Sequence, residues 1–436
     1  MRHINPFLVI PALLFTWFFQ AQQVLPVKKE QVLEQVMEKN RKLNITKQEF
    51  LAAKADYHQT NAVFLPNISV SHTAMTTTNP LMAFGFKLNQ ESIVQSDFNP
   101  DLLNNPDRVN NFATKIEVEQ PLLNFDAITQ RSAAKKKMQA TELQSLRTED
   151  AIKMEVEKAY MQLQLAYKAV DVLENALKAA RENLKLAENS FKQGYLQKSD
   201  VLAVRVRVGE VENKLQYAKS NVNNASDYLS FLMDGKQGIL LKPTDTLSIT
   251  TLPEEAPELS ENRADIQAMY LAVQAREKMH LSDKLSFLPR LNAFGSYELY
   301  DNDLFQGSAN GYIAGVSLSW DILKGTKRFG EMAKSKAEAE KSRLEYEQYV
   351  DQSKMEIARA KRALKDAENQ LNLTSLALEQ SRESLRIRRN RFEQGLEKTT
   401  ELLMSESMVS QKELEFYQTV YEYNYALEYL KFLRKS

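Results

Sequence analysis

Two acidic residues, Asp200 and Glu401, occupy equivalent places in a stretch that occurs twice. The two stretches are FKQGYLQKSDVL, from Phe191 to Leu202, and FEQGLEKTTELL, from Phe392 to Leu403. Carboxylates brought together from several chains would attract cations at an opening. A carboxylate in the first turn of a helix also stabilises the helix dipole, and the preceding Ser199 and Thr400 are suitable N-caps. Both interpretations of the acidic pair therefore stay open.

Residue types that carry catalysis or bind metals are sparse elsewhere. Cysteine is absent, and the four histidines lack the spacing of metal ligands. No nucleophile motif or phosphate-binding loop is present. Lys and Arg number 57, as do Asp and Glu, and this balance argues against nucleic acid, whose binding surface needs excess positive charge. We expect no enzyme activity, no cofactor, no metal site and no nucleic-acid partner.

The N-terminal segment is typical of a secretory signal peptide over residues 1–21. It has a basic start at Arg2, an apolar run from Phe7 to Phe19 and a small residue at Ala21. The run is shorter than the ~20 residues of a membrane-spanning helix, although an uncleaved anchor stays open as an alternative. No later apolar stretch has spanning length. The mature protein is then expected either to be soluble outside the cytoplasm or to cross a membrane by strands.

Glycine and proline number 12 each, which favours long elements with few turns. Apolar residues recur at alternating steps of four and three, the period of a coiled coil. One row of this seam is mostly large and the other mostly alanine, which allows close helix packing. The rows are Val156, Leu163, Val170, Leu177, Leu184 and Phe191, and Ala159, Ala166, Ala180 and Ala187. The large row recurs in the second half from Ile357 to Phe392.

The seam resumes after each quoted stretch, so each half contains a helical hairpin with that stretch as its turn. Gly194 and Gly395 stand where the end of a helix favours a left-handed residue. The outgoing helix, from Ile128 to Phe191, would be about 95 Å long, but the return helix only about 50 Å. A helix from Val27 to Phe64, about 55 Å long, would supply the difference. Its counterpart in the second half runs from Arg263 to Phe287.

Each upstream helix ends in the tripeptide FLP, after which apolar and polar residues alternate. This pattern predicts strands over residues 66–78, 110–120, 289–300 and 311–320, the length of tilted transmembrane strands. The expected membrane-facing residues are Leu291, Tyr297, Tyr312, Val316, Leu318 and Trp320. The alternative is a pair of soluble β-hairpins, each with one solvent-exposed face. Because four strands cannot close a barrel, a membrane location would require several chains to pool them. The segment from Asn79 to Asn110 has loop composition, and its LMAFGF stretch is expected to pack on the rest of that loop.

The ordered set of these features resembles the TolC-like outer-membrane efflux proteins over nearly the whole mature chain. The match includes the turn pattern F-x-x-G-x-x-x-x-x-D-V-L. It also includes NRADIQAMYLAVQARE, from Asn262 to Glu277, and WDILKGTKR, from Trp320 to Arg328. Each motif alone is weak, but the set appears twice in order. The implied function is a passive exit duct for small molecules or polypeptides, in a tripartite efflux or type I secretion system.

The resemblance also implies partners and a location. Three chains would form a homotrimer, with a 12-stranded barrel among outer-membrane lipid and an α-helical tunnel in the periplasm. The turns would bind a periplasmic adaptor protein, and an inner-membrane transporter would be reached indirectly. The expected contacts with the adaptor are Gly194, Tyr195, Leu196, Gly395 and Leu396. The resemblance implies acidic gate residues inside the second turn, where Glu401 matches one such position, and Asp200 is its equivalent in the first turn. Met404 occupies the next gate position, so a double acidic ring is not preserved.

The expected fold is mostly α with a small β part, as two tandem repeats of helix, β-hairpin and long helical hairpin. The first repeat covers 22–234, with its helical hairpin at 127–233. A linker or equatorial segment covers 235–261, and the second repeat covers 262–436, with its helical hairpin at 326–434. A periplasmic adaptor or a structural coiled-coil protein of the envelope would also contain such helices. Neither alternative explains two hairpins together with duplicated amphipathic strands.

Overall fold

The computed structural model describes residues 24–250, 260, 262–304 and 306–435. The expected signal peptide and part of the expected linker lie outside the described residues. The chain divides into two compact units. Unit 1 comprises Met1–Leu43, Glu149–Ala256 and Ile357–Leu433, and unit 2 comprises Asn44–Thr148, Pro257–Glu356 and Arg434–Ser436.

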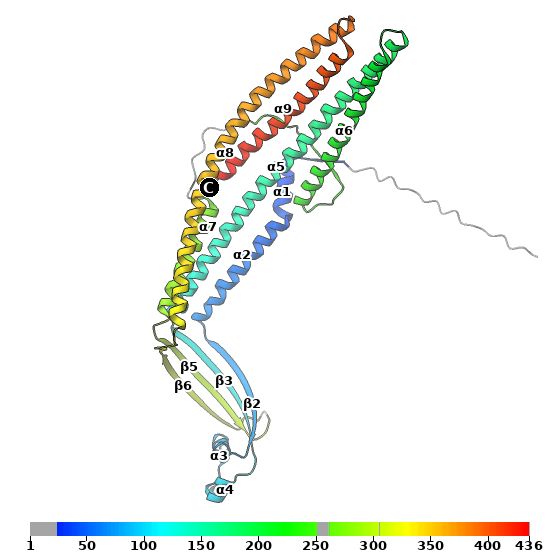
Figure 1. Cartoon of the computed structure of the whole chain (residues 1–436). Coiled ribbons are helices and arrows are strands. Elements are labelled where there is room, and N and C mark those ends of the chain that lie inside the picture. Colours follow the sequence, from blue (N-terminus) through cyan, green and yellow to red (C-terminus); the bar gives the residue numbers. More distant parts are fainter. Residues whose placement is uncertain (1–23, 251–259, 261, 305, 436) are drawn as a thin grey trace, which may run out of the picture. The chain divides into compact units, whose positions relative to one another are not determined.

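The element order repeats, as the sequence pattern predicts (Figure 1). The first repeat contains α1 (Lys29–Lys39), α2 (Arg41–Gln59), β2 (Asn67–Thr77), β3 (Val109–Leu123), α5 (Phe125–Lys192) and α6 (Lys198–Leu232). The second contains α7 (Ala264–Leu285), β5 (Arg290–Asp301), β6 (Ala309–Ser319), α8 (Lys327–Glu393) and α9 (Thr399–Arg434). The fold is mostly helical with a small sheet, which confirms the expected class.

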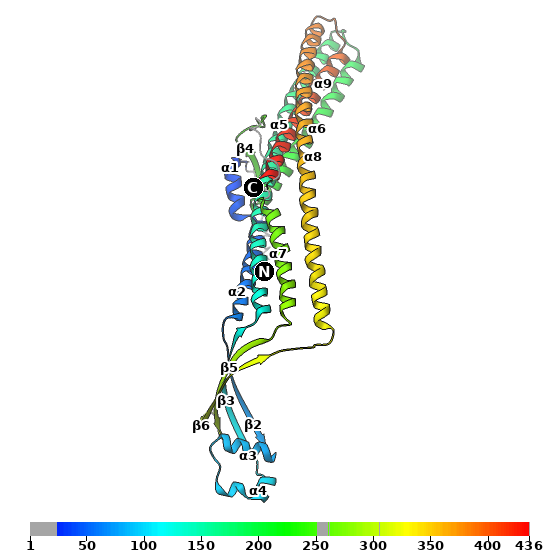
Figure 2. The ribbon, with the colours of Figure 1, turned by 90° about the vertical axis from the view of Figure 1, so that its left-hand side faces the viewer.

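The core of unit 1 follows the predicted seam. Val156 and Leu163 of α5 are fully buried, and they belong to one cluster with Leu229 of α6. Farther along the hairpin, Leu177 and Ala180 of α5 pack with Val211 and Leu215 of α6. Burying each large aliphatic side chain contributes about 1.5–3 kcal/mol, so the seam holds the two antiparallel helices together. Figure 2 shows this hairpin beside the α8–α9 hairpin within unit 1.

The helix expected from Val27 to Phe64 is wrong as one element, because the structure divides it. Strand β1 (Val24–Val27) comes first, and the chain breaks again at Asn40, between α1 and α2. The Asn40 Nδ2 donates to the Leu232 carbonyl at 2.9 Å, and its Oδ1 accepts from the Lys42 N–H at 3.0 Å. Asn40 therefore both ties this break to the end of α6 and satisfies an N–H group of α2.

A short strand in the expected linker was not predicted. Strand β4 (Leu240–Pro243) pairs in parallel with β1, with Val24 opposite Leu240. Leu241 is buried in the same cluster as Val156. Each strand has only four residues, which is too short to show an alternating pattern.

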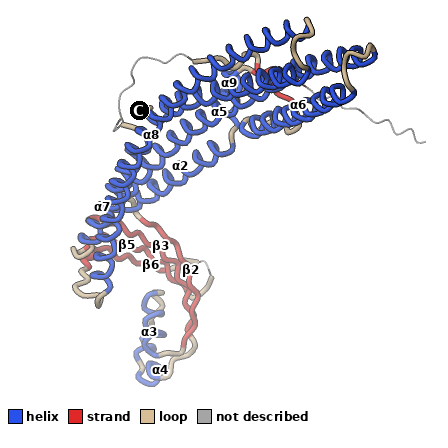
Figure 3. Tube along the Cα trace, turned by 45° about the horizontal axis from the view of Figure 1, so that its top comes forward, coloured by secondary structure: helices blue, strands red, loops and turns tan. Residues whose placement is uncertain are grey.

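Unit 2 is built on an antiparallel sheet of order β2–β3–β5–β6, drawn in red in Figure 3. Strand β3 pairs with β2 through Val109–Glu119 and with β5 through Phe112–Leu123, and a register shift falls between Pro121 and Leu123. At the start of α7, the buried Arg263 donates to Asp265 at 2.7 Å and to Ser353 of α8 at 2.7 Å. Asp265 also pairs with Arg147 of α5 at 3.1 Å. This network fastens α7 to two other helices.

The segment between β2 and β3 is not the plain loop that its composition suggested. It contains α3 (Pro80–Asn89), a 3₁₀ turn at Gln95–Phe98 and α4 (Pro100–Asn104). Asn79 caps α3 by accepting from the Met82 N–H at 3.1 Å, and Asn99 caps α4 by accepting from the Asp101 N–H at 3.0 Å. In each case proline follows the cap as the first helical residue, which is a helix-start signal. The expected packing of LMAFGF on the rest of this segment is confirmed by the edge-to-face contact between Phe84 and Phe98.

Candidate functional site

The two hairpin turns have the same backbone. Gly194 has φ +81° and Gly395 has φ +73°, which confirms the predicted left-handed residues. The Tyr195 N–H donates to the Ser190 carbonyl at 2.9 Å, and the Leu396 N–H donates to the Arg391 carbonyl at 2.9 Å. These are the bonds of a Schellman motif, in which glycine satisfies the last carbonyls of a helix. Both turns lie at the same end of unit 1 (Figure 1).

The apolar side chains at the turns differ in exposure. Tyr195 is 80% exposed and Leu396 is 63% exposed, so neither fills a core in the single chain. Leu196, by contrast, packs against the cluster of Ala187, Val201 and Val204 and so has a core to fill. Tyr195 and Leu396 are therefore the exposed apolar groups at the tips of these two turns.

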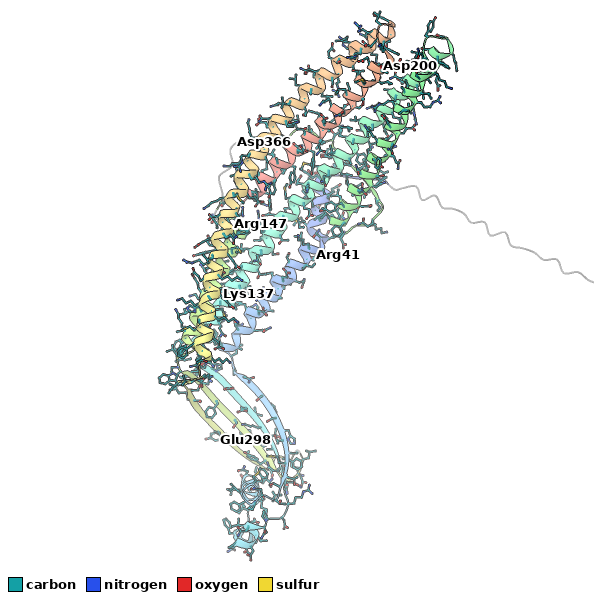
Figure 4. All side chains as sticks on the ribbon, viewed as in Figure 1. Arg41, Lys137, Arg147, Asp200, Glu298 and Asp366 are labelled. Carbon is teal, nitrogen blue, oxygen red and sulfur yellow. The ribbon has the colours of Figure 1, made fainter. Side chains whose placement is uncertain are left out.

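The two equivalent carboxylates have different partners. Asp200, labelled in Figure 4, accepts from the Gln197 N–H at 3.1 Å through its Oδ2. It thus caps the start of α6, whose N-cap is Gln197 and not the expected Ser199. Helix α9 begins at Thr399, so Thr400 already lies in its first turn. Glu401 accepts instead from Arg388 Nη1 at 2.8 Å, across the turn.

Arginines surround the second turn, although the sequence motifs of the turns do not indicate them. Arg388 lies 3.5 Å from Glu397, and Arg391 lies 3.1 Å from the same carboxylate. Arg389 pairs with Glu406 at 3.1 Å, and Glu406 also accepts from Asn183 of the other hairpin at 2.6 Å. The run RIRRNRF was the available signal, since it places basic residues on several sides of the last turns of α8. The first turn has no comparable set of ion pairs among the contacts described.

The sheet has one apolar and one polar side. Cross-strand pairing places Leu291 opposite Leu318, Ala293 opposite Val316, and Tyr297 opposite Tyr312. Ile116 and Val118 of β3 and Val70 and Ile68 of β2 continue the same side. We call this side the apolar face. Five of the six expected membrane-facing residues lie on the apolar face. The sixth, Trp320, follows β6 and donates a hydrogen bond to the Phe287 carbonyl at 3.0 Å.

The opposite side, which we call the polar face, carries Ser71, Lys115, Glu117, Ser296, Glu298 and Ser317 among its residues. Lys115 Nζ lies 3.3 Å from Glu117 and 3.7 Å from Glu298, which is labelled in Figure 4. Tyr300 donates a hydrogen bond to Glu298. Most large apolar side chains thus lie on one face, and the charged groups lie on the other together with Phe294 and Ile313, an arrangement like that of a wall between lipid and water.

Within the described residues, no group of three or more His, Cys, Asp or Glu side chains is placed to hold a metal ion. No helix in the described ranges is both long enough and apolar enough to cross a membrane.

A family model described as "Outer membrane efflux protein" matches residues 32–235 and 256–433. The chain belongs to this family, and its function is that of an outer-membrane efflux channel. The family is one of transport channels, not of enzymes. A search of curated protein sequences gave no match.

Solved structures show the same fold. The Campylobacter jejuni CmeC outer membrane channel has a TM-score of 0.81 and 16% identity, covering 93% of this chain and 85% of that one. The open state of the Neisseria gonorrhoeae MtrE outer membrane channel has a TM-score of 0.77 and 15% identity, with coverages of 93% and 88%. The outer membrane protein VceC from Vibrio cholerae has a TM-score of 0.77 and 16% identity, with coverages of 92% and 95%. At these identities the similarity establishes the fold alone.

Proposed function

We propose that three copies of this chain form a passive exit duct in the outer membrane, with the apolar face of the sheet toward lipid and the polar face toward a water-filled passage. The observation that carries the proposal is the division of one four-stranded sheet into these two faces. Strands β2 and β6 are its edges, and neither has a second partner among the described strands. Unpaired backbone groups are costly in lipid, so the edges must pair with neighbouring copies. Three copies would give 12 strands.

The hairpin turns are the proposed contact with a periplasmic adaptor. Gly194 and Gly395 fix the two turns in the same backbone conformation, and Tyr195 and Leu396 present exposed apolar groups. Leu196 would support this contact indirectly, because its side chain packs the first turn against α6. An inner-membrane transporter would then be coupled through the adaptor. Asp200 and Glu401 would contribute negative charge near the periplasmic opening.

Arginine substitutions at neighbouring positions of β6 test the placement of the two faces. Val316→Arg and Leu318→Arg would each put a charge in lipid and destabilise the assembly by about 2–4 kcal/mol near the membrane midplane. Ser317→Arg is the matched control, because Ser317 lies between them on the polar face. Trimer yield would be measured by heat-modifiable migration of outer-membrane fractions in detergent. Normal assembly of both apolar-face variants would refute the proposal, as would equal losses in all three.

A further inference from the structure

The segment between β2 and β3 covers the polar face of the sheet at one end. Helix α3 lies against β3 and β6, at the end of the sheet opposite α2 and α7 (Figure 2). The strand residues buried there include Val109 and Asn111 of β3, Ala309 of β6 and Asp301 of β5, at 7%, 1%, 1% and 2% exposure. By their pairing with Thr77, Met75 and Tyr300, the first three belong to the polar face, whereas Asp301 pairs with Phe112 at the end of the apolar face. Their apolar-face neighbours Asn110 and Asn310 remain exposed.

A buried glutamine fastens α3 in this position. Gln90, the residue that ends α3, has its Nε2 2.8 Å from the Asn110 carbonyl and 3.0 Å from Asn111 Oδ1. The same Nε2 lies 3.0 Å from the Asp301 carbonyl of β5. One amide group therefore bridges the ends of two adjacent strands. The contacts with Asn111 and Asp301 are buried, so loss of Gln90 would remove hydrogen bonds that water cannot readily replace, at a cost that favours the fastened position.

The covering segment also has internal contacts. Lys87 of α3 pairs with Asp97 at 2.7 Å, and the other oxygen of Asp97 accepts from the Val94 N–H at 2.8 Å. Phe84 and Phe98 pack edge to face with ring centroids 5.8 Å apart. These contacts join α3 to the 3₁₀ turn that follows it. The segment is thus a folded body over the polar face and not an open loop.

We propose that residues 78–108 narrow the exterior opening of the duct and set the size of solute that enters or leaves there. The inference rests on the proposed function, because it requires the polar face to line the passage. A body held on that face at the end of the strands occupies part of the opening in each chain. Helix α3 would then exclude large molecules on the outside while small solutes pass.

Cysteine labelling from outside intact cells tests this proposal, because the chain has no cysteine of its own. Ser71→Cys places a thiol on the polar face, and Val70→Cys places one on the apolar face of the same strand. Each would be made in the full chain and in a version whose residues 78–108 are replaced by Asn-Gly. Thr77 and Val109 are already paired, so a two-residue hairpin turn can join them in register.

The probes are a small neutral maleimide and a maleimide carrying a long polyethylene glycol chain. In the full chain, Ser71→Cys should react readily with the small probe. The large probe should react about tenfold more slowly than in the shortened version, since its rate follows the fraction of time the opening is wide. In the full chain, Gln90→Ala should raise the labelling rate of the large probe toward the rate in the shortened version. Asn89→Ala, a change at an exposed neighbour, should leave that rate unchanged. Equal rates of the large probe in both versions would overturn the proposed narrowing.

Failure of the proposed function gives a different result. In the shortened version, the small probe should label Ser71→Cys much faster than Val70→Cys, because only the polar face would be exposed to water. Similar rates at these two positions would mean that the faces are not divided between lipid and water. That outcome would overturn the duct itself, and with it the proposed narrowing.

Discussion

The two repeats of the chain share their backbone plan but differ in how it is fastened. Asn40 and Arg263 stand at the same distance before the two FLP tripeptides, each just before a helix. In the first repeat, a neutral amide ties this point to the Leu232 carbonyl. In the second, Arg263 and Asp265 form a buried ion pair that extends to Arg147 and Ser353. The start of the helix at this position is thus held by neutral hydrogen bonds in the first repeat and by an ion pair in the second.

The turns differ in the same way. Their glycines and Schellman bonds are equivalent, yet Asp200 caps a helix while Glu401 belongs to a set of arginine ion pairs. A duplicated backbone conformation requires particular residues, because only glycine adopts positive φ without strain. Side-chain partners are free to diverge. The second repeat should accordingly be more sensitive to pH and salt than the first.

The largest effect is expected at the buried ion pair. Asp265→Asn would leave the Arg263 charge buried without its carboxylate and should cost about 3–5 kcal/mol of stability. Asn40→Ala, its counterpart in the first repeat, removes a neutral hydrogen bond and should cost about 1–3 kcal/mol. Denaturant unfolding of the detergent-solubilised protein would measure both. A larger loss for Asn40→Ala would reverse the comparison.

The same pair predicts an acid transition. Burial alone would raise the pKa of Asp265, but hydrogen bonds from Arg263 and Tyr349 and the charges of Arg147 and Arg263 lower that pKa below 3.8. Since the folded state holds the carboxylate ionised, its stabilisation is present above pH 3.8 and is lost as pH falls through the lowered value. Stability measured against pH should therefore fall less steeply in Asp265→Asn than in the wild type. If stability fell equally steeply with pH in both proteins, Asp265 would not be a cause of the acid sensitivity.

The two turn glycines should respond alike. A Cβ added at Gly194 or Gly395 meets no atom within 4 Å, so only the positive φ opposes it. Gly194→Ala and Gly395→Ala should each cost about 1–2 kcal/mol locally, whereas Gly209→Ala, within helix α6, should stabilise by about 0.5–1 kcal/mol. Bulkier substitutions at the turns should also abolish efflux without preventing trimer formation. Drug susceptibility and trimer yield would be compared, and efflux retained in the bulky variants would exclude the turns as the adaptor contact.

The acidic residues of the turns give the smallest expected effect and separate two roles. If they act as an opening charge, Asp200→Asn combined with Glu401→Gln should reduce cation selectivity of single channels, because carboxylates attract cations over a Debye length of about 10 Å. Arg388→Ala should increase the cation selectivity, because Glu401 would lose its ion pair with Arg388. If they act only at helix ends, selectivity should stay constant while Asp200→Asn costs about 0.3–1 kcal/mol. Reversal potentials across a KCl gradient decide between the two.

The sequence predicted those features that depend on periodic patterns or on one residue type. The seam residues Val156 and Leu163, the glycines at positive φ and the alternation that puts Leu291 and Leu318 on one face all follow from spacing. The break at Asn40 escaped prediction because a side-chain bond to the distant Leu232 causes it. Strands β1 and β4 were too short to show a period. The partners of Asp200 and Glu401 depend on which side chains the turn brings together, and spacing alone does not specify that.

The pairing of the sheet also governs where the chain can change length. A single residue inserted into β3 would move every following side chain to the opposite face and place Glu117 among the apolar residues. An insertion in α5 would similarly displace the seam unless it came in whole heptads. The segment between Thr77 and Val109 has neither constraint, because its ends are already paired in register. Insertions and deletions should therefore accumulate there, so residues 78–108 are the part of this channel that evolution can reshape most freely.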